Sequence, residues 1–91
     1  MGTTIYAFAT QEALEAARNA DSSLNGTNSF VGIQTAIDAA AEGDSVQPAA
    51  GDYPESLTVK SGVTLLGVQS GKLTGLLGIE IQEGAGLLGS Q

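Results

Sequence analysis

Apolar residues recur along the chain at two different spacings, which predict a helix followed by strands. Residues 33–40 read Ile-Gln-Thr-Ala-Ile-Asp-Ala-Ala, so apolar residues fall at i, i+3, i+4 and i+7. This spacing puts them on one face of an amphipathic α-helix. The residues of that face are Ile33, Ala36, Ile37 and Ala40. We expect Asn28 or Ser29 to cap the start of the helix and a left-handed Gly43 to end it.

A strand and a second helix are predicted ahead of this element. Residues 4–8 alternate weakly between polar and apolar side chains and are typical of a short strand. Thr10 suits the N-cap of a helix that runs to about Ala20. The apolar face of that helix is small, mainly Leu14 and Ala17, so we expect it to pack on the surface of a larger unit.

The second half of the chain alternates with a period of two, which predicts strands with one face inward. The expected inward pairs are Leu57 with Val59, Val63 with Leu65, and Ile79 with Ile81. An internal repeat recurs at equal intervals as Thr64-Leu-Leu-Gly67, Gly75-Leu-Leu-Gly78 and Gly86-Leu-Leu-Gly89. Two such intervals, from position 64 to position 86, give a length that suits one coil of a β-solenoid. A β-meander is the alternative arrangement.

The order of these elements resembles the opening of a pectin-lyase-like protein. The resemblance rests on the helix at 33–40, the Gly43-Asp44 turn and the Gly51-Asp-Tyr-Pro-Glu55 turn. In that family such a helix caps the solenoid, and the strands after it form the first coils. The resemblance therefore implies a mainly β fold: a right-handed parallel β-helix of few coils with N-terminal capping α-helices.

We expect a single domain, because 91 residues are too few for two. It divides into a strand, helix and loop (1–28), a capping helix (29–44) and β-helix coils (45–91). Gln47 and Pro48 depart from the family pattern, since Gln47 is polar and Pro48 cannot donate to a ladder. We expect their strand to be an edge, to be irregular, or to be paired on one side only.

Composition narrows the range of partners. Ten acidic residues face three basic ones, for a net charge of −7, so nucleic acid and anionic membranes are poor partners. The absence of Cys and His removes disulfides, thiol catalysis, Ser-His catalysis and most zinc sites. No signal peptide is visible, while the resemblance implies a secreted or cell-surface protein of a bacterium.

Candidate chemistry is limited to two groups of acidic residues. Asp52 and Glu55 could pair as acid and base, but we expect a solvated turn in which Asp52 bonds nearby backbone amides. The catalytic residues of the pectin-lyase-like family lie on later coils, and none maps onto this chain. The calcium candidates are Asp38, Glu42 and Asp44, whose negative charge opposes the dipole at the end of a helix. No other cofactor is expected.

These observations favour a non-catalytic structural or self-assembling module: the cap and first coils of a secreted or surface β-helix protein. We expect it to self-associate through the C-terminal coil, because the third repeat is cut short at Gln91 and leaves an open edge. The alternative is an N-terminal fragment of a polysaccharide-active enzyme, of the pectin esterase or lyase class, whose active site lies outside this chain. Polysaccharide binding by the chain itself is disfavoured by its few aromatic residues.

Overall fold

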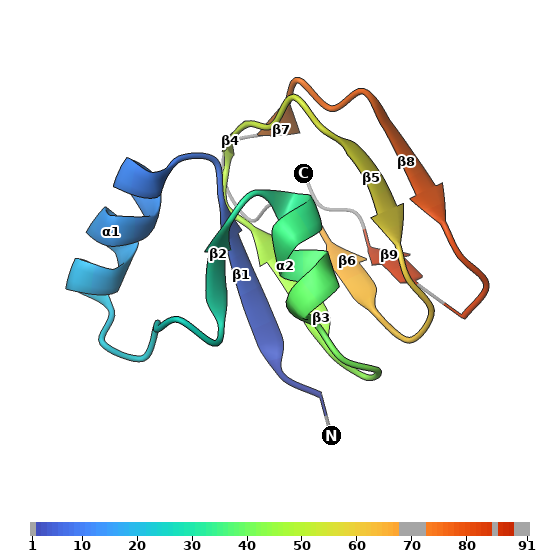
Figure 1. The fold of residues 1–91 in the computed structure, drawn as a ribbon, viewed down its shortest axis with the longest axis horizontal. Coiled ribbons are helices and arrows are strands. Elements are labelled where there is room, and N and C mark those ends of the chain that lie inside the picture. The colour runs from blue at the N-terminus through green and yellow to red at the C-terminus, as the bar shows by residue number, and fades with distance from the viewer. Residues whose placement is uncertain (1, 68–72, 85, 89–91) are drawn as a thin grey trace.

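The computed structural model describes residues 2–67, 73–84 and 86–88, which form helices and strands around one core (Figure 1). In chain order the elements are β1 (Thr4–Phe8), α1 (Gln11–Ala20), β2 (Ser29–Val31), α2 (Ile33–Ala39), β3 (Ser45–Pro48), β4 (Gly51–Asp52), β5 (Ser56–Val59), β6 (Thr64–Leu66), β7 (Leu73–Thr74), β8 (Gly78–Ile81) and β9 (Gly86–Leu88). All strand pairings in these described ranges are parallel. The structure is therefore mixed, with more strand than helix, and the antiparallel pairs of a β-meander do not occur there.

The strands form one sheet of five, in the order β2-β1-β3-β6-β9, and two pairs, β4–β7 and β5–β8. The chain passes through β3, β4 and β5, which we call the first circuit, and then through β6, β7 and β8, the second circuit. Each strand of the second circuit lies beside its counterpart in the first (Figure 1). After the second circuit, β9 returns to the five-stranded sheet beside β6.

The pairing register follows the sequence repeat. Gly51 pairs with Leu73, Ser56 with Gly78 and Thr64 with Gly86. In each pair the partners are 22 positions apart, as are Asp52 and Thr74. Two repeat units therefore separate stacked strands. The first and third units begin on the five-stranded sheet, whereas the second lies between β7 and β8. Gly89, which closes the third unit, lies outside the described residues.

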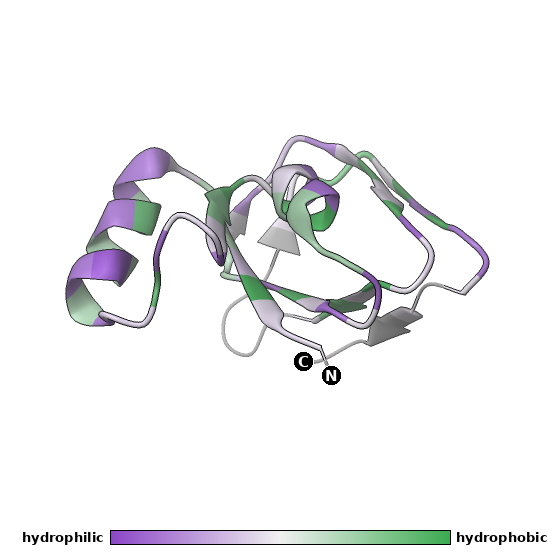
Figure 2. Ribbon diagram, turned by 60° about the horizontal axis from the view of Figure 1, so that its bottom comes forward, coloured by the Kyte–Doolittle hydropathy of each residue, from purple (hydrophilic) through white to green (hydrophobic). Residues whose placement is uncertain are grey.

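The first strand and helix match their predictions. β1 has the predicted bounds, and α1 begins after Thr10, whose Oγ1 accepts a hydrogen bond from Ala13 N at 3.1 Å. Leu14 is the buried residue of α1. Figure 2 shows α1 to one side of the sheets, with hydrophilic residues over much of its surface. This agrees with a helix that packs on a larger unit through a small apolar face.

The capping helix is shorter than predicted. Residues 29–44 were expected to be helical, but α2 covers Ile33–Ala39, and Ser29–Val31 pair with β1 as a strand. Gly32 separates the two elements with a φ of 95°, a conformation that favours glycine. The predicted cap at Asn28 or Ser29 is therefore wrong. The local spacing of apolar residues cannot show that residues 29–31 have a strand, β1, to pair with.

The end of α2 differs as well. Its C-cap is Ala40, in an extended conformation, rather than Gly43. Gly43 does have a positive φ of 93°, but it lies in the turn that leads into β3. The left-handed glycine was thus predicted correctly in conformation and wrongly in role.

Pro48 is accommodated without an edge strand. β3 lies inside the five-stranded sheet, but its register with β6 ends at Val46, while its register with β1 continues to Pro48. Ala49 N donates to Ala7 O on β1, so by alternation the nitrogen of Pro48 faces β6. Gln47 Nε2 donates to Pro48 O at 3.1 Å and to Gly67 O at 2.9 Å. Residues 47 and 48 therefore pair with β1 only, which confirms the expected pairing on one side. The prediction that this strand is an edge of the sheet is wrong.

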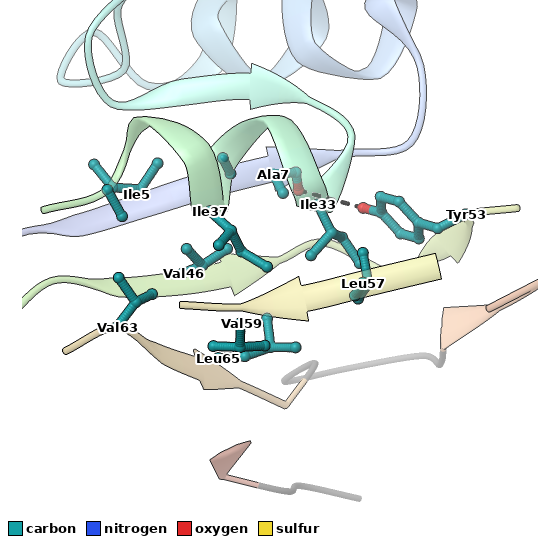
Figure 3. Close-up of a cluster of buried hydrophobic side chains, with 12 residues drawn as sticks. Ile5, Ala7, Ile33, Ile37, Val46, Tyr53, Leu57, Val59, Val63 and Leu65 are labelled. Atoms are coloured by element: carbon teal, nitrogen blue, oxygen red, sulfur yellow. Dashed lines mark hydrogen bonds between the residues drawn. The ribbon is translucent and has the colours of Figure 1, made fainter. Parts of the chain in front are cut away.

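The core lies between α2 and the inner faces of the strands (Figure 3). Figure 3 shows Ile33 and Ile37 pointing from α2 into the space between β3 and β5. The whole predicted face of α2 is buried, which confirms the amphipathic helix. Full burial of an isoleucine side chain such as Ile33 or Ile37 contributes about 1.5–3 kcal/mol to stability. The core residues are Ile5, Ala7, Ile33, Ala36, Ile37, Ala40, Val46, Tyr53, Leu57, Val59, Val63 and Leu65.

Tyr53 is the one aromatic residue of this core, and it is 1% exposed. Its hydroxyl donates to Ala49 O at 2.6 Å and also lies 3.3 Å from Ala7 O, the contact drawn in Figure 3. Burial raises the pKa of Tyr53 to about 12, and the nearby Glu55 carboxylate acts in the same direction. The folded state therefore holds the phenol proton more tightly than the unfolded chain does.

We predict that this proton makes the fold sensitive to alkali. The stabilising contribution is complete below the ordinary tyrosine pKa of about 10 and is lost as the pH rises towards about 12, which lowers the free energy of unfolding by up to about 3 kcal/mol. Urea unfolding of Tyr53→Phe should show a smaller loss over this range. At neutral pH the variant should be less stable by about 1 kcal/mol, because it lacks the bond to Ala49 O.

The matched control is Tyr6→Phe, which removes the other tyrosine of the chain. In that variant the tyrosinate absorbance reports Tyr53 alone, and it should rise only near pH 12 or on unfolding. Equal alkaline losses for the native chain and Tyr53→Phe would contradict this account.

Candidate functional site

The turn that contains Asp52 and Glu55 holds α2 in place. Glu55 Oε2 accepts a hydrogen bond from Ile33 N at 2.9 Å, and Oε1 accepts one from Gln34 N at 3.0 Å. Gly32, at the N-cap position, provides no side-chain hydrogen bond. Glu55 therefore satisfies two of the free N–H groups at the start of the helix, where the helix dipole also favours a negative charge.

Asp52 connects the two circuits. Its Oδ1 accepts a hydrogen bond from Thr74 Oγ1 at 3.0 Å, and Asp52 pairs with Thr74 in the register of β4 and β7. Asp52 therefore bonds a side chain 22 positions further on, instead of the nearby backbone amides that the turn sequence predicts. Both carboxylates of the turn thus join elements that are distant in sequence.

Gln34 covers the outer side of β5. Gln82 N donates to Val59 O, so by alternation the backbone groups of Thr58 face away from β8. Gln34 Oε1 accepts from Thr58 N at 2.8 Å, and Gln34 Nε2 donates to Thr58 O at 3.3 Å. The side-chain amide therefore occupies the positions that a neighbouring strand would fill.

Lys60 holds the other end of the same helix. Its Nζ donates to Asp38 O at 3.1 Å, near the C-terminus of α2. Glu55 and Gln34 act at the first turn of α2 and Lys60 acts near its last residue, so the helix is fixed along β5 at both ends. Sequence reasoning missed all three contacts, since they join residues 21 to 24 positions apart.

Arg18 has a similar position at the outer strand of the five-stranded sheet. Tyr6 N donates to Asn28 O and Gly32 N donates to Phe8 O, so by alternation the carbonyl of Ser29 faces away from β1. Arg18 Nη2 donates to Ser29 O at 3.0 Å, and Arg18 Nε donates to Ser29 Oγ at 3.0 Å. α1 thus places a guanidinium group against the free side of β2.

The structure does not bring the three calcium candidates together. No group of three metal-ligating acids occurs in the described part of the chain. Asp38 Oδ1 accepts from Gln34 Nε2 at 3.0 Å. The two oxygens of Asp44 accept from Ala41 N at 2.9 Å and Thr3 N at 2.8 Å. Those bonds lower the pKa of Asp44, and they tie the start of β1 to the turn before β3.

Glu42 lies apart from this arrangement and packs beside Gly62. A Cβ atom at Gly62 would lie 2.6 Å from Glu42 Cγ. The acids that the sequence grouped together therefore have separate contacts. Asp44 stabilises a turn, whereas the Asp38 carboxylate bonds Gln34 on its own helix and the Asp38 carbonyl bonds Lys60.

The far side of the second circuit is apolar and uncovered. Ile79 pairs with Leu57, and Ile81 pairs with Val59. The first-circuit residues are buried, but Ile79 and Ile81 are each 41% exposed and Leu77 is 74% exposed. These are the exposed large hydrophobic residues of the described ranges. Ile79 and Ile81 therefore lie in line with buried residues, as expected for an inward pair, but they stay partly exposed because no described strand lies beyond β8.

Comparisons with known proteins leave the function to be argued from this geometry. No protein-family model, no curated protein and no solved structure matches the chain. Neither helix of the described ranges is long and apolar enough to cross a membrane.

We predict that Glu55 contributes to stability through α2. Glu55→Ala leaves Ile33 N and Gln34 N without partners and should lower the free energy of unfolding by about 2 kcal/mol. Glu55→Gln keeps one acceptor oxygen and should lose about half as much. Glu80→Ala, a change at an exposed acid on β8, is the matched control and should stay within about 0.5 kcal/mol. Urea denaturation followed by circular dichroism measures all three, and equal effects for Glu55→Ala and Glu80→Ala would contradict the prediction.

Proposed function

We propose that this chain is the N-terminal cap and first two coils of a right-handed parallel β-helix, and that it serves as a non-catalytic, self-associating structural module. The observation that carries the proposal is the offset of 22 positions shared by β4–β7, β5–β8 and β6–β9. A solenoid requires this regularity, because each coil contacts its neighbours through the same positions. The right-handed sense follows the strong preference of parallel crossover connections.

The contacts of α2 support its role as the cap. The helix buries Ile33, Ala36 and Ile37 against the inner faces of the strands. It also covers the outer side of β5 through Gln34. A helix in this position removes both an apolar opening and a free strand edge, the two liabilities at the end of a solenoid.

The contacts of the acidic residues support a structural rather than a catalytic role. Glu55 binds the start of α2 and Asp52 binds Thr74. A glycosidase needs two carboxylates facing each other across a groove, whereas these two hold elements together. No observation on the described residues favours the alternative, a fragment of a polysaccharide-active enzyme. A secreted or cell-surface setting in a bacterium remains part of the proposal through the family resemblance alone.

The edge of the second circuit supports self-association. β8 has one neighbour, β5, among the described strands, and its apolar side chains are partly exposed. An unpaired strand edge with exposed apolar residues is a template for pairing with another chain. We assign this edge, residues 77–81, as the association surface and call it the β8 edge.

Duplication of sequence segments tests the solenoid. A second copy of residues 56–77, inserted after Leu77, repeats the segment that separates β5 from β8 in the pairing register. It should add one coil, with more β signal in circular dichroism and higher stability. A second copy of residues 56–66 adds half of this length and should disrupt stacking. The strands after the insertion would then no longer lie 22 positions from their partners in the first circuit. Equal stability of the two duplications would overturn the solenoid proposal.

Light-scattering mass across a concentration series tests self-association. The native chain should exceed the mass of one chain as concentration rises. Ile79→Thr with Ile81→Thr keeps β-branched side chains but removes apolar surface, and it should weaken the association. Glu80→Thr alters the opposite face of β8 and serves as the control. A native chain that stays monomeric throughout would overturn this part of the proposal.

A further inference from the structure

We propose that two copies of this chain join at the β8 edge in antiparallel fashion about a two-fold axis at Ile79, and that assembly stops at this dimer. The inference rests on the self-association proposed above and adds its partner, register and stoichiometry. It is carried by the pattern of residues on β8 and by the covered edges on the opposite side of the molecule.

The backbone of β8 permits this pairing. Gln82 N donates to Val59 O on β5, and the groups of a strand alternate between its two sides. The N–H and C=O groups of Ile79 and Ile81 therefore face away from β5. In an antiparallel pair centred on Ile79, its two groups bond to the same groups of the second copy.

The apolar side chains of the edge are symmetric about Ile79. With Ile79 opposite its own counterpart, Leu77 of each copy lies opposite Ile81 of the other, because 77 and 81 are equidistant from 79. Leu77 precedes β8 and its N–H donates to Glu55 O, so this outer pair is a contact between side chains and not a ladder pair. All three exposed large hydrophobic residues of the described ranges are then covered at once. Cross-strand apolar pairs of this kind are the unit that stabilises a sheet.

The charged residues of the edge favour the same register. In the pairing centred on Ile79, Glu80 lies opposite Gly78, so no two carboxylates of the strand face each other. A pairing centred on Glu80 would instead place two Glu80 carboxylates directly opposite each other, which is destabilising. A shift by one residue would place isoleucine opposite glutamate and lose the apolar face.

The opposite edges prevent further growth. A second chain that stacked its β8 on β5 would have to displace Gln34 from Thr58. The free side of β2 is likewise occupied by Arg18, which donates to Ser29 O. Because the β8 edge of one copy cannot stack on β5 or β2 of another, the contact is two-fold and not head-to-tail, which gives a closed pair rather than a filament.

Single cysteines test the register in the full chain, which contains no native cysteine. At a two-fold axis through a hydrogen-bonded pair the two Cα atoms lie about 5.5 Å apart, within the range of a disulfide. Ile79→Cys should therefore cross-link to a covalent dimer on oxidation. Glu80→Cys is the matched control. It should remain uncross-linked, because its counterpart is displaced by two positions along the second copy.

Light-scattering mass tests the stoichiometry. The native chain should reach twice the mass of one chain and rise no further with concentration, and added salt should strengthen the pair by screening the net charge of −7 on each copy. Gln34→Ala exposes the edge of β5 and should grow beyond two chains, whereas the neighbouring Thr35→Ala should not. Circular dichroism checks that both variants are folded.

The outcomes separate the two proposals. A native chain that is monomeric at every concentration overturns self-association itself. A native chain that associates but passes two chains in mass, or in which Glu80→Cys cross-links as readily as Ile79→Cys, overturns the two-fold dimer alone.

Discussion

The position of α2 on the described strands depends on the two hydrogen bonds between Glu55 and the start of the helix. They join residues 22 and 21 positions apart and fix the helix against the strand that follows Glu55. Gly32 offers α2 no cap of its own, so the helix obtains a favourable end only when the first circuit has closed. The burial of Ile33 and Ile37 beneath the helix depends on the same contact.

The two outer sides of the stacked strands differ in how their backbone groups are covered. On one side the outward-facing backbone groups meet side chains, with Arg18 at β2 and Gln34 at β5. On the other side β8 presents backbone groups and three exposed apolar residues. The first side differs because polar side chains form the hydrogen bonds that a further strand would form. They satisfy the edge and keep another chain from pairing with it.

Periodic features were predictable from the sequence, and contacts between distant residues were not. The α2 face, the inward pairs at Leu57 and Val63, and the spacing of the repeat all follow from regular patterns that each segment carries by itself. Ser29–Val31 was misassigned as helix because so short a strand depends on the neighbouring β1 rather than on its own pattern. Glu55 looked like half of an acid pair, since no local rule connects it with a helix that ends well before it, at Ala39.

The exclusively parallel pairing has a consequence for how the described part of the chain folds. Even the smallest offset among its strand pairs, that between Ser45 and Thr64, spans several elements, and Thr4 of β1 pairs with Ser45 across two helices and a strand. No hairpin can therefore form early and serve as a template. Chain entropy must be lost in closing long loops before any ladder forms, which slows folding and raises the contact order.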